Sequence, residues 1–314
     1  MGGPLAPLSA ADTMPAEGRG CEITCRIARG VLGEIPWRKA PEMTVDAIGS
    51  FWGKARPDSE AGPRWHPLAW HMLDVAASAQ AILKVRPGPR RVMTQLVGLQ
   101  EADAIRLAVL IAALHDIGKF AAPFQQKAIG PEWPFARPRD AQLGASQHDR
   151  DGLALWRHCL SRELANRIWP GAERALDRLI GASVGHHGRA VDTSHCNAAE
   201  TFRPEGMAAA QTYAAALVDL LLPAPIDAPP RDEQDLGAAT FWFAGFVTIA
   251  DWAGSTQAYF RYAPPDIPIE SYWRTTQDKA TTAVRALGLA PARPSELKPS
   301  SAADYTALIP ELAA

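Results

Sequence analysis

Cysteine is scarce in this chain, and the few that occur do not form a disulfide framework. Four cysteines are scattered over 314 residues, at Cys21, Cys25, Cys159 and Cys196; disulfide-stabilised secreted domains are far denser in them. Cys21 and Cys25 are spaced to share a helix face, but no nearby His or Cys completes a zinc site. The sequence therefore predicts reduced thiols and a cytoplasmic protein.

Neither an excess of positive charge nor a membrane-spanning run is evident. The 32 Lys and Arg residues are balanced by 34 Asp and Glu, whereas proteins that bind duplex nucleic acid non-specifically usually present a basic face. A nucleic-acid substrate would need metal ions or a partner to supply positive charge. No apolar run approaches the ~20 residues of a membrane helix. The Gly- and Pro-rich first twenty residues also lack the apolar core of a signal peptide.

Strand-like alternation of apolar and polar residues is almost missing from the chain. Apolar residues recur instead at helical spacing. This spacing predicts helices over residues 68–83, 102–115, 148–166, 171–185, 206–222, 235–258 and 269–287. The stretch Pro87-Gly88-Pro89 is expected to end the first helix. The predicted fold class is therefore all-α.

The composition divides the chain into three parts. Residues 1–45 are expected to be a partly disordered N-terminal extension, 46–290 a single helical domain, and 291–314 a polar C-terminal linker or docking tail. The proline-rich stretch 223–230 lies inside the domain, because candidate functional residues occur on both sides of it.

A histidine and an aspartate stand side by side after the most apolar helix. Residues 104–114 are almost entirely apolar, and His115 and Asp116 follow them. Placing two such side chains at the end of a buried helix is costly unless they are paired or bind a metal. Gly118 is expected to stop the helix.

Most of the eight histidines also lie at the ends of predicted helices or beside glycines. His66 and His71 open the first long helix, and His148 precedes another. His186 and His187 are bracketed by glycines, which permit an irregular helix end where both rings converge although helical neighbours point about 100° apart. A further carboxylate, Asp251, lies within an apolar helix.

Imidazole and carboxylate ligands together suit first-row transition metals. Two such ions ~3.5–4 Å apart, held by a bridging carboxylate, cleave phosphoesters. Other candidates have simpler interpretations. His158 and His195 are expected to be solvated, Asp74 and Asp149 to cap or solvate helices, and Phe241-Trp242-Phe243 to pack in the core.

Taken in order, these segments resemble the HD superfamily of metal-dependent phosphohydrolases. Within it they are most similar to the HD nuclease domains of CRISPR-associated Cas3, particularly the type I-E form. The segments are Phe-Trp-Gly-Lys (51–54), His-Pro-Leu-Ala-Trp-His-Met-Leu-Asp-Val-Ala-Ala (66–77), Leu-His-Asp-Ile-Gly-Lys-Phe (114–120), Phe-Gln-Gln-Lys (124–127), Gly-His-His-Gly (185–188) and Ala-Asp-Trp-Ala-Gly-Ser (250–255).

The resemblance implies an HD-domain helical bundle with a metal centre in its core. It further implies endonuclease and 3′–5′ exonuclease activity on single-stranded DNA in CRISPR interference. Two divalent transition-metal ions would be needed: Mn, Ni, Co or Fe, with Mg and Zn as alternatives. Carried over by position, the implied metal ligands are His71, His115, Asp116, His148, His186, His187 and Asp251. His115, Asp116 and Lys119 would be catalytic, with Lys119 meeting the scissile phosphate and Ser255 near the metals. His66 remains the alternative to His71 as the first metal ligand. Otherwise it would contact the substrate or one of the residues that hold the metal.

A Walker A sequence, the phosphate-binding loop of a helicase, occurs nowhere in the chain. The resemblance therefore implies a separate nuclease subunit or a truncated form of Cas3. Its partners would be single-stranded DNA, the Cas3 helicase part and the CRISPR surveillance complex. Two rival functions remain: an HD-type nucleotide phosphohydrolase or phosphodiesterase, and a catalytically silent HD binding module.

Overall fold

The computed structural model describes residues 48–56, 62–128, 145–189, 191–192 and 198–291. The expectations for residues 1–45, for Cys196 and His195, and for nearly all of the 291–314 tail lie outside this part of the chain. The α-helices are α3 (Leu68–Val85), α4 (Pro87–Val97), α5 (Glu101–Ala113), α6 (Ala122–Gln125), α7 (His148–Leu155), α8 (Ser161–Ile168), α9 (Glu173–Val184), α10 (Ala198–Thr201), α11 (Pro204–Leu221), α12 (Gly237–Gly254) and α13 (Ile269–Ala286).

Two very short strands, β1 (Trp52–Lys54) and β2 (His66–Pro67), pair antiparallel and make up the sheet of the described residues. The predicted all-α class is therefore confirmed. Each of the seven predicted helical segments is helical over most of its length, and their ends shift by a few residues.

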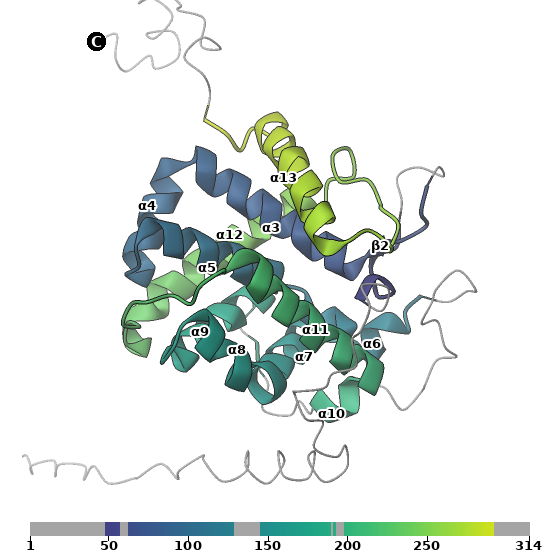
Figure 1. Cartoon of the computed structure of the whole chain (residues 1–314), viewed down its shortest axis with the longest axis horizontal. Helices are drawn as coiled ribbons and strands as arrows, with labels where there is room; N and C mark the ends of the chain where they lie inside the picture. Colours follow the sequence, from purple (N-terminus) through teal and green to yellow (C-terminus); the bar gives the residue numbers. More distant parts are fainter. Residues whose placement is uncertain (1–47, 57–61, 129–144, 190, 193–197, 292–314) are drawn as a thin grey trace, which may run out of the picture. The chain divides into compact units, whose positions relative to one another are not determined.

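Helix α3 is the central element of the bundle. It packs against α13, α12 and α5 (Figure 1), and nearly all of its side chains are buried. Alanine is frequent along it, which suits both helix formation and close packing. Gly254 at the end of α12 allows one such approach, because a Cβ there would lie 2.8 Å from the Val75 backbone.

The structure differs from the sequence predictions in several respects. A new helix, α4, begins directly at Pro87, because proline is well tolerated in the first turn. The predicted helix 148–166 is interrupted by a π-helical stretch, Trp156–Leu160, between α7 and α8. Phe241 is 84% exposed whereas Phe243 is fully buried, so the core prediction for this aromatic run is wrong at Phe241.

One helical stretch, Gln234–Gly254, is long and apolar enough to cross a membrane by length and composition alone. This differs from the expectation that no run approaches a membrane span. The same stretch is a packed element of the bundle, since α12 contacts α3 and α9. The expected absence of membrane association stays a prediction.

Candidate metal centre

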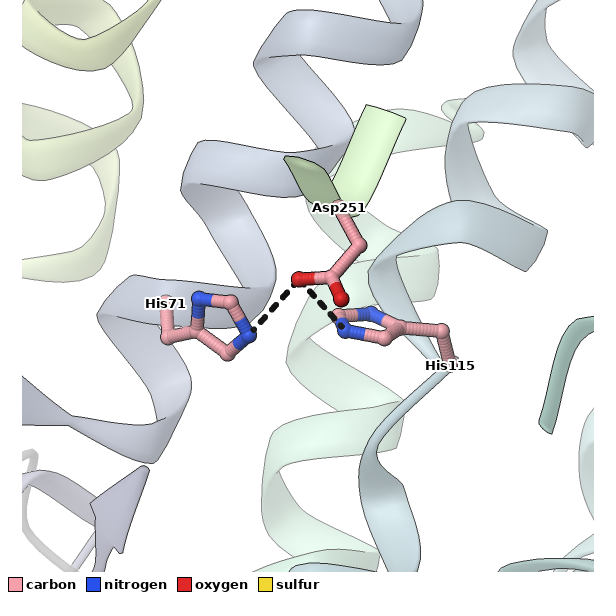
Figure 2. Close-up of side chains that lie close together, drawn as sticks. All are labelled: His71, His115 and Asp251. Atoms are coloured by element: carbon pink, nitrogen blue, oxygen red, sulfur yellow. Dashed lines mark ion pairs between the residues drawn. The ribbon is translucent and has the colours of Figure 1, made fainter. Parts of the chain in front are cut away.

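Four predicted residues from three parts of the chain meet in the core. His71 comes from the first turn of α3, His115 and Asp116 follow α5, and Asp251 comes from the last turn of α12. The Nε2 atoms of His71 and His115 each lie 3.2 Å from Asp116 Oδ2. Both also form ion pairs with Asp251 Oδ1 (Figure 2). The distances to this oxygen are 3.4 Å for His71 and 3.8 Å for His115. We call these four residues the inner cluster.

The turn after α5 sets the direction of His115 and Asp116. The helix ends at Ala113, and a 3-10 turn over Ile117–Phe120 follows directly after Asp116. Gly118 was expected to stop the helix, but it lies within this turn instead. Its role is packing: a Cβ at Gly118 would lie 1.8 Å from the His148 carbonyl oxygen. The glycine therefore allows α7 to bring His148 to the centre.

Three further histidines complete the surroundings, and we call them the outer histidines: His148, His186 and His187. His148 Nε2 lies 3.6 Å from Asp116 Oδ1, and His186 Nε2 lies 3.9 Å from Asp251 Oδ2. His187 Nε2 lies 3.1 Å from His148 Nε2.

The glycine-flanked doublet brings both of its rings to the centre, as its irregular helix end predicted. Helix α9 ends at Val184, and Gly188 has a left-handed φ of 83°.

Several buried polar atoms of the inner cluster have no hydrogen-bond partner among the described residues. They are both ring nitrogens of His71, His115 Nε2 and Asp116 Oδ1. Leaving such atoms unpaired in the core is expensive. Hydrogen bonds at Nδ1 orient two of the rings. His115 Nδ1 lies 2.8 Å from the Ala112 carbonyl oxygen, and His186 Nδ1 lies 2.9 Å from the Ser183 carbonyl oxygen. Nδ1–H donation to a carbonyl leaves Nε2 free as a metal ligand.

The donor set therefore fits divalent ions of the first transition series. The ligand atoms of His71, His115 and Asp251 lie within 4.8 Å of one another, as do those of His115, Asp116 and His186.

For five of these groups the electrostatic environment favours the form that binds metal. Burial lowers the pKa of both His148 and His186 to about 4, which favours the neutral ring. Burial also lowers the pKa of His71, and nearby Lys54 adds to this. Although burial raises the pKa of Asp116 and Asp251, their cationic and hydrogen-bonding neighbours lower both pKa values below the usual range. Both aspartates therefore stay ionised.

Polar neighbours hold the two aspartates in place. Lys119 Nζ donates to Asp116 Oδ2 at 2.5 Å, and Ser255 Oγ donates to Asp251 Oδ1 at 2.9 Å. Lys54 Nζ lies 3.9 Å from Asp251 Oδ1, and burial lowers its pKa. The sequence assigned Lys54 no role beyond its place in the Phe-Trp-Gly-Lys motif, because only the fold brings β1 beside α12's aspartate.

His66, the alternative first ligand, belongs to a different buried cluster. Its Nδ1 accepts a hydrogen bond from the Ala263 amide at 3.2 Å, and its Nε2 donates to Asp74 Oδ2 at 2.9 Å. Asp74 also accepts hydrogen bonds from the hydroxyls of Tyr272 and Thr276. The expectation that Asp74 caps or solvates a helix is therefore wrong, since it is fully buried. We call His66, Asp74, Tyr272 and Thr276 the saturated cluster.

The remaining predictions for single residues hold where the structure describes them. His158 is exposed on the π-helical stretch, as expected. Asp149 lies in the first turn of α7 and accepts a hydrogen bond from the Arg150 amide.

The fold and the centre together define a helical domain whose buried histidines and aspartates are arranged to bind divalent metal ions. Comparison with known families agrees with this class. The family model described as "Cas3, HD domain" matches residues 52–260. The chain therefore belongs to the Cas3 HD-domain family.

Curated relatives carry the same family name. The chain is 28% identical over 229 residues to the CRISPR-associated endonuclease/helicase Cas3 of Thermus thermophilus, covering 70% of this chain and 24% of the relative. It is 26% identical over 279 residues to the protein of that name from Escherichia coli, covering 77% of this chain and 30% of the relative. The chain thus spans less than a third of these relatives.

Solved structures are similar over most of the chain. The crystal structure of the Thermus thermophilus Cas3 HD domain in the presence of Ni²⁺ is 26% identical, with a TM-score of 0.54. The match covers 80% of this chain and 93% of that domain. A crystal structure of a CRISPR-associated protein, also 26% identical, has a TM-score of 0.66 and covers 85% of this chain and 30% of that one.

Proposed function

We propose that this chain is a metal-dependent nuclease of CRISPR interference that hydrolyses phosphodiester bonds in single-stranded DNA, both internally and from 3′ ends. The observation that carries the proposal is the inner cluster, whose buried ring nitrogens and carboxylate oxygen lack partners in the described residues. The Ni²⁺ in the name of the similar Thermus thermophilus HD domain structure, and the word endonuclease in the names of both curated relatives, support it.

The proposed centre holds two divalent ions, of Mn, Ni, Co or Fe, with Mg and Zn as alternatives. The two aspartates support this number because each faces both sets of histidines. Asp116 points Oδ2 at His71 and His115 and Oδ1 at His148. Asp251 points Oδ1 at the inner histidines and Oδ2 at His186. Carboxylates that face both sets of histidines in this way would suit a centre that holds two metal ions.

The residues of the chain have distinct roles in the proposed reaction. His71, His115, Asp116 and Asp251 hold one ion, and His148, His186 and His187 complete the site of the other. Bound divalent ions supply Lewis acidity that activates water and stabilises charge on the phosphate. Lys119 holds Asp116 in its ionised form and adds positive charge beside the scissile phosphate.

The proposed nuclease domain spans residues 46–290, with an extension at 1–45 and a tail at 291–314. Its proposed partners are single-stranded DNA, the helicase part of Cas3 and the CRISPR surveillance complex. The name endonuclease/helicase of both curated relatives supports the helicase part. Single-stranded DNA and the surveillance complex are carried over from the resemblance of the sequence motifs, and the near-balanced charge of the chain is compatible with a strand that a partner delivers. The proposed compartment is the cytoplasm.

The test is cleavage of circular single-stranded DNA by metal-stripped protein re-supplied with Mn, Ni, Co, Zn or Mg. A circle has no ends, so its cleavage is endonucleolytic; a linear strand labelled at its 5′ end then reports 3′–5′ digestion. Asp116→Ala should abolish cleavage, whereas Asp177→Ala, which removes an ion pair with Arg157, should retain it. Cleavage at the wild-type rate by Asp116→Ala contradicts the proposal. Hydrolysis of mononucleotides without strand cleavage identifies a nucleotide phosphohydrolase instead.

A further inference from the structure

Lys54 is a second cation at the centre, on the side of Asp251. Its Nζ lies 3.9 Å from Asp251 Oδ1, which is within ion-pair range but too far for a hydrogen bond. Its side chain is 31% exposed, compared with 10% for Lys119. Lys54 therefore stands where the centre is accessible to solvent.

The chain positions Lys54 through close packing of β1 against α3. Gly53 makes this approach possible, because a Cβ there would lie 2.9 Å from Leu68 Cα and 3.4 Å from His71 Cβ. The strand pairs with β2 at the start of α3, with Lys54 opposite His66. The backbone of Lys54 is thus fixed relative to the helix that carries His71.

Gln125 connects the segments that carry the two lysines. Its Nε2 donates to the carbonyl oxygens of both Trp52 and Lys119, and its Oε1 accepts from the Trp52 amide. The Trp52 indole donates to the Gln125 carbonyl and stacks on Phe124. The buried Gln125 side chain therefore fixes β1 relative to the turn after α5. As a result, the ammonium groups of Lys54 and Lys119 are both held at the metal centre.

The ammonium groups of Lys119 and Lys54 differ in the contacts that they already make. Lys119 donates to Asp116 and lies over the Phe124 ring, with 5.3 Å from Nζ to the ring centroid. Within the described residues Lys54 Nζ makes no hydrogen bond, and the carboxylate oxygen with which it forms an ion pair, Asp251 Oδ1, already accepts a hydrogen bond from Ser255. The Lys54 ammonium thus retains its donors for an incoming anion.

We propose that Lys54 binds a non-bridging phosphate oxygen of the single strand at the metal centre and so positions the strand for cleavage. The proposal rests on the proposed nuclease function. An ammonium is a compact charge with three donors and suits a phosphate oxygen. Partial burial strengthens its attraction to an anion. The role is one of substrate positioning and does not include holding metal.

The test is the salt dependence of strand binding by metal-loaded protein. Binding of a short oligothymidine with phosphorothioate linkages, which slow cleavage, is measured by fluorescence anisotropy over a range of salt concentrations. The variants are Lys54→Gln, Lys54→Arg and the control Lys84→Gln, an exposed lysine in the last turn of α3. Metal content and thermal unfolding are measured on each.

Lys54→Gln should reduce the salt slope by about 0.7, the value for one lost contact to a single strand. Its affinity should fall by roughly tenfold or more, as for a hydrogen bond to a charged group. Metal content should be unchanged, Lys54→Arg should restore most of the slope, and Lys84→Gln should equal wild type. An unchanged slope and affinity in Lys54→Gln would overturn the proposal, and so would a loss of metal that accounts for its weaker binding.

The binding measurement separates this proposal from the nuclease function. If wild-type protein binds the strand but cleaves none with any metal, the nuclease proposal fails and the slope comparison still decides the role of Lys54. If metal-loaded wild type binds no strand, both proposals are wrong.

Discussion

Helix α3 carries two buried histidine–aspartate clusters that differ in how fully their polar atoms are paired. His66 lies just before the helix in the saturated cluster, and His71 lies in its first turn in the inner cluster. Both rings are almost completely buried, and both face a carboxylate. In the saturated cluster both ring nitrogens of His66 have partners. In the inner cluster neither nitrogen of His71 has a hydrogen-bond partner within the described residues.

The comparison shows that burial and residue type do not by themselves make a metal site. Asp74 accepts hydrogen bonds from His66, Tyr272 and Thr276, so its charge is compensated by the protein. These bonds join α3 to α13, and Trp70 stacks on Tyr272 beside them. The saturated cluster is a structural connection, whereas the inner cluster is left for a ligand that supplies positive charge.

The largest expected effect comes from His71→Ala in the inner cluster. Affinity for Ni²⁺ or Mn²⁺ should fall by more than about 100-fold. Removing even a residue that hydrogen-bonds to a metal ligand lowers metal affinity by about 10–100-fold, and His71 is itself a proposed ligand. Competition with a chelating dye measures the affinity. Metal-free stability should change less than in Asp74→Ala, since His71 loses only its contacts with Asp116 and Asp251, at 3.2 and 3.4 Å, which lie in the ion-pair range. Metal affinity within threefold of wild type, roughly the scatter of single-site effects, would equate the two clusters and contradict the account.

The opposite outcome is expected for Asp74→Ala in the saturated cluster. Removing Asp74 takes away the carboxylate that accepts hydrogen bonds from three buried donors, so the free energy of unfolding should fall by about 3–5 kcal/mol. Urea denaturation measures this loss, and the folded fraction should still bind metal. Tyr272→Phe removes a single donor and should cost only about 1 kcal/mol. Loss of metal from folded Asp74→Ala protein would show that the clusters are not independent.

Acid should weaken the metal-free protein through the outer histidines. Burial lowers the pKa of His148 and His186 to about 4, against about 6.5 in an unfolded chain. Above about pH 6.5 these rings are neutral in both states. Between that pH and 4 only the unfolded chain gains the protons, so the free energy of unfolding should fall across this window. Urea denaturation at a series of pH values should show the fall, and His186→Asn should flatten it. A wild-type profile without slope in this window would be inconsistent with buried neutral rings.

The smallest expected effect is that of Ser255→Ala. Ser255 donates to Asp251 Oδ1 and so orients a ligand without touching the metal in the proposed centre. Its removal should weaken metal binding by roughly tenfold, at the low end of effects seen for partners of ligands. Thr256→Ala is the matched control, because the Thr256 hydroxyl donates to the Trp252 carbonyl. Equal metal affinities in the two variants would remove Ser255 from the account.

The helices could be predicted from the sequence because apolar spacing is a local signal. The set of candidate ligands was expected from the resemblance of the motifs to a known family. The sequence did not distinguish the two histidines of residues 66–71 by geometry. That difference depends on Tyr272 and Thr276, about 200 residues away along the chain. Asp74 was misread for the same reason, since its partners come from α13. The exposure of Phe241 beside buried Phe243 also depends on which face of α12 the other helices cover. The role of Lys54 required the packing of β1 against α3.

The number of divalent ions held by the protein tests the central claim most directly. Metal-stripped protein is dialysed against Ni²⁺ or Mn²⁺, and the bound metal is measured per chain together with His71→Ala and His148→Ala. We expect two ions per chain in wild type, and a loss of metal when either histidine is removed. A wild-type protein that binds no ion, or whose bound metal is unaffected by either substitution, would contradict that claim.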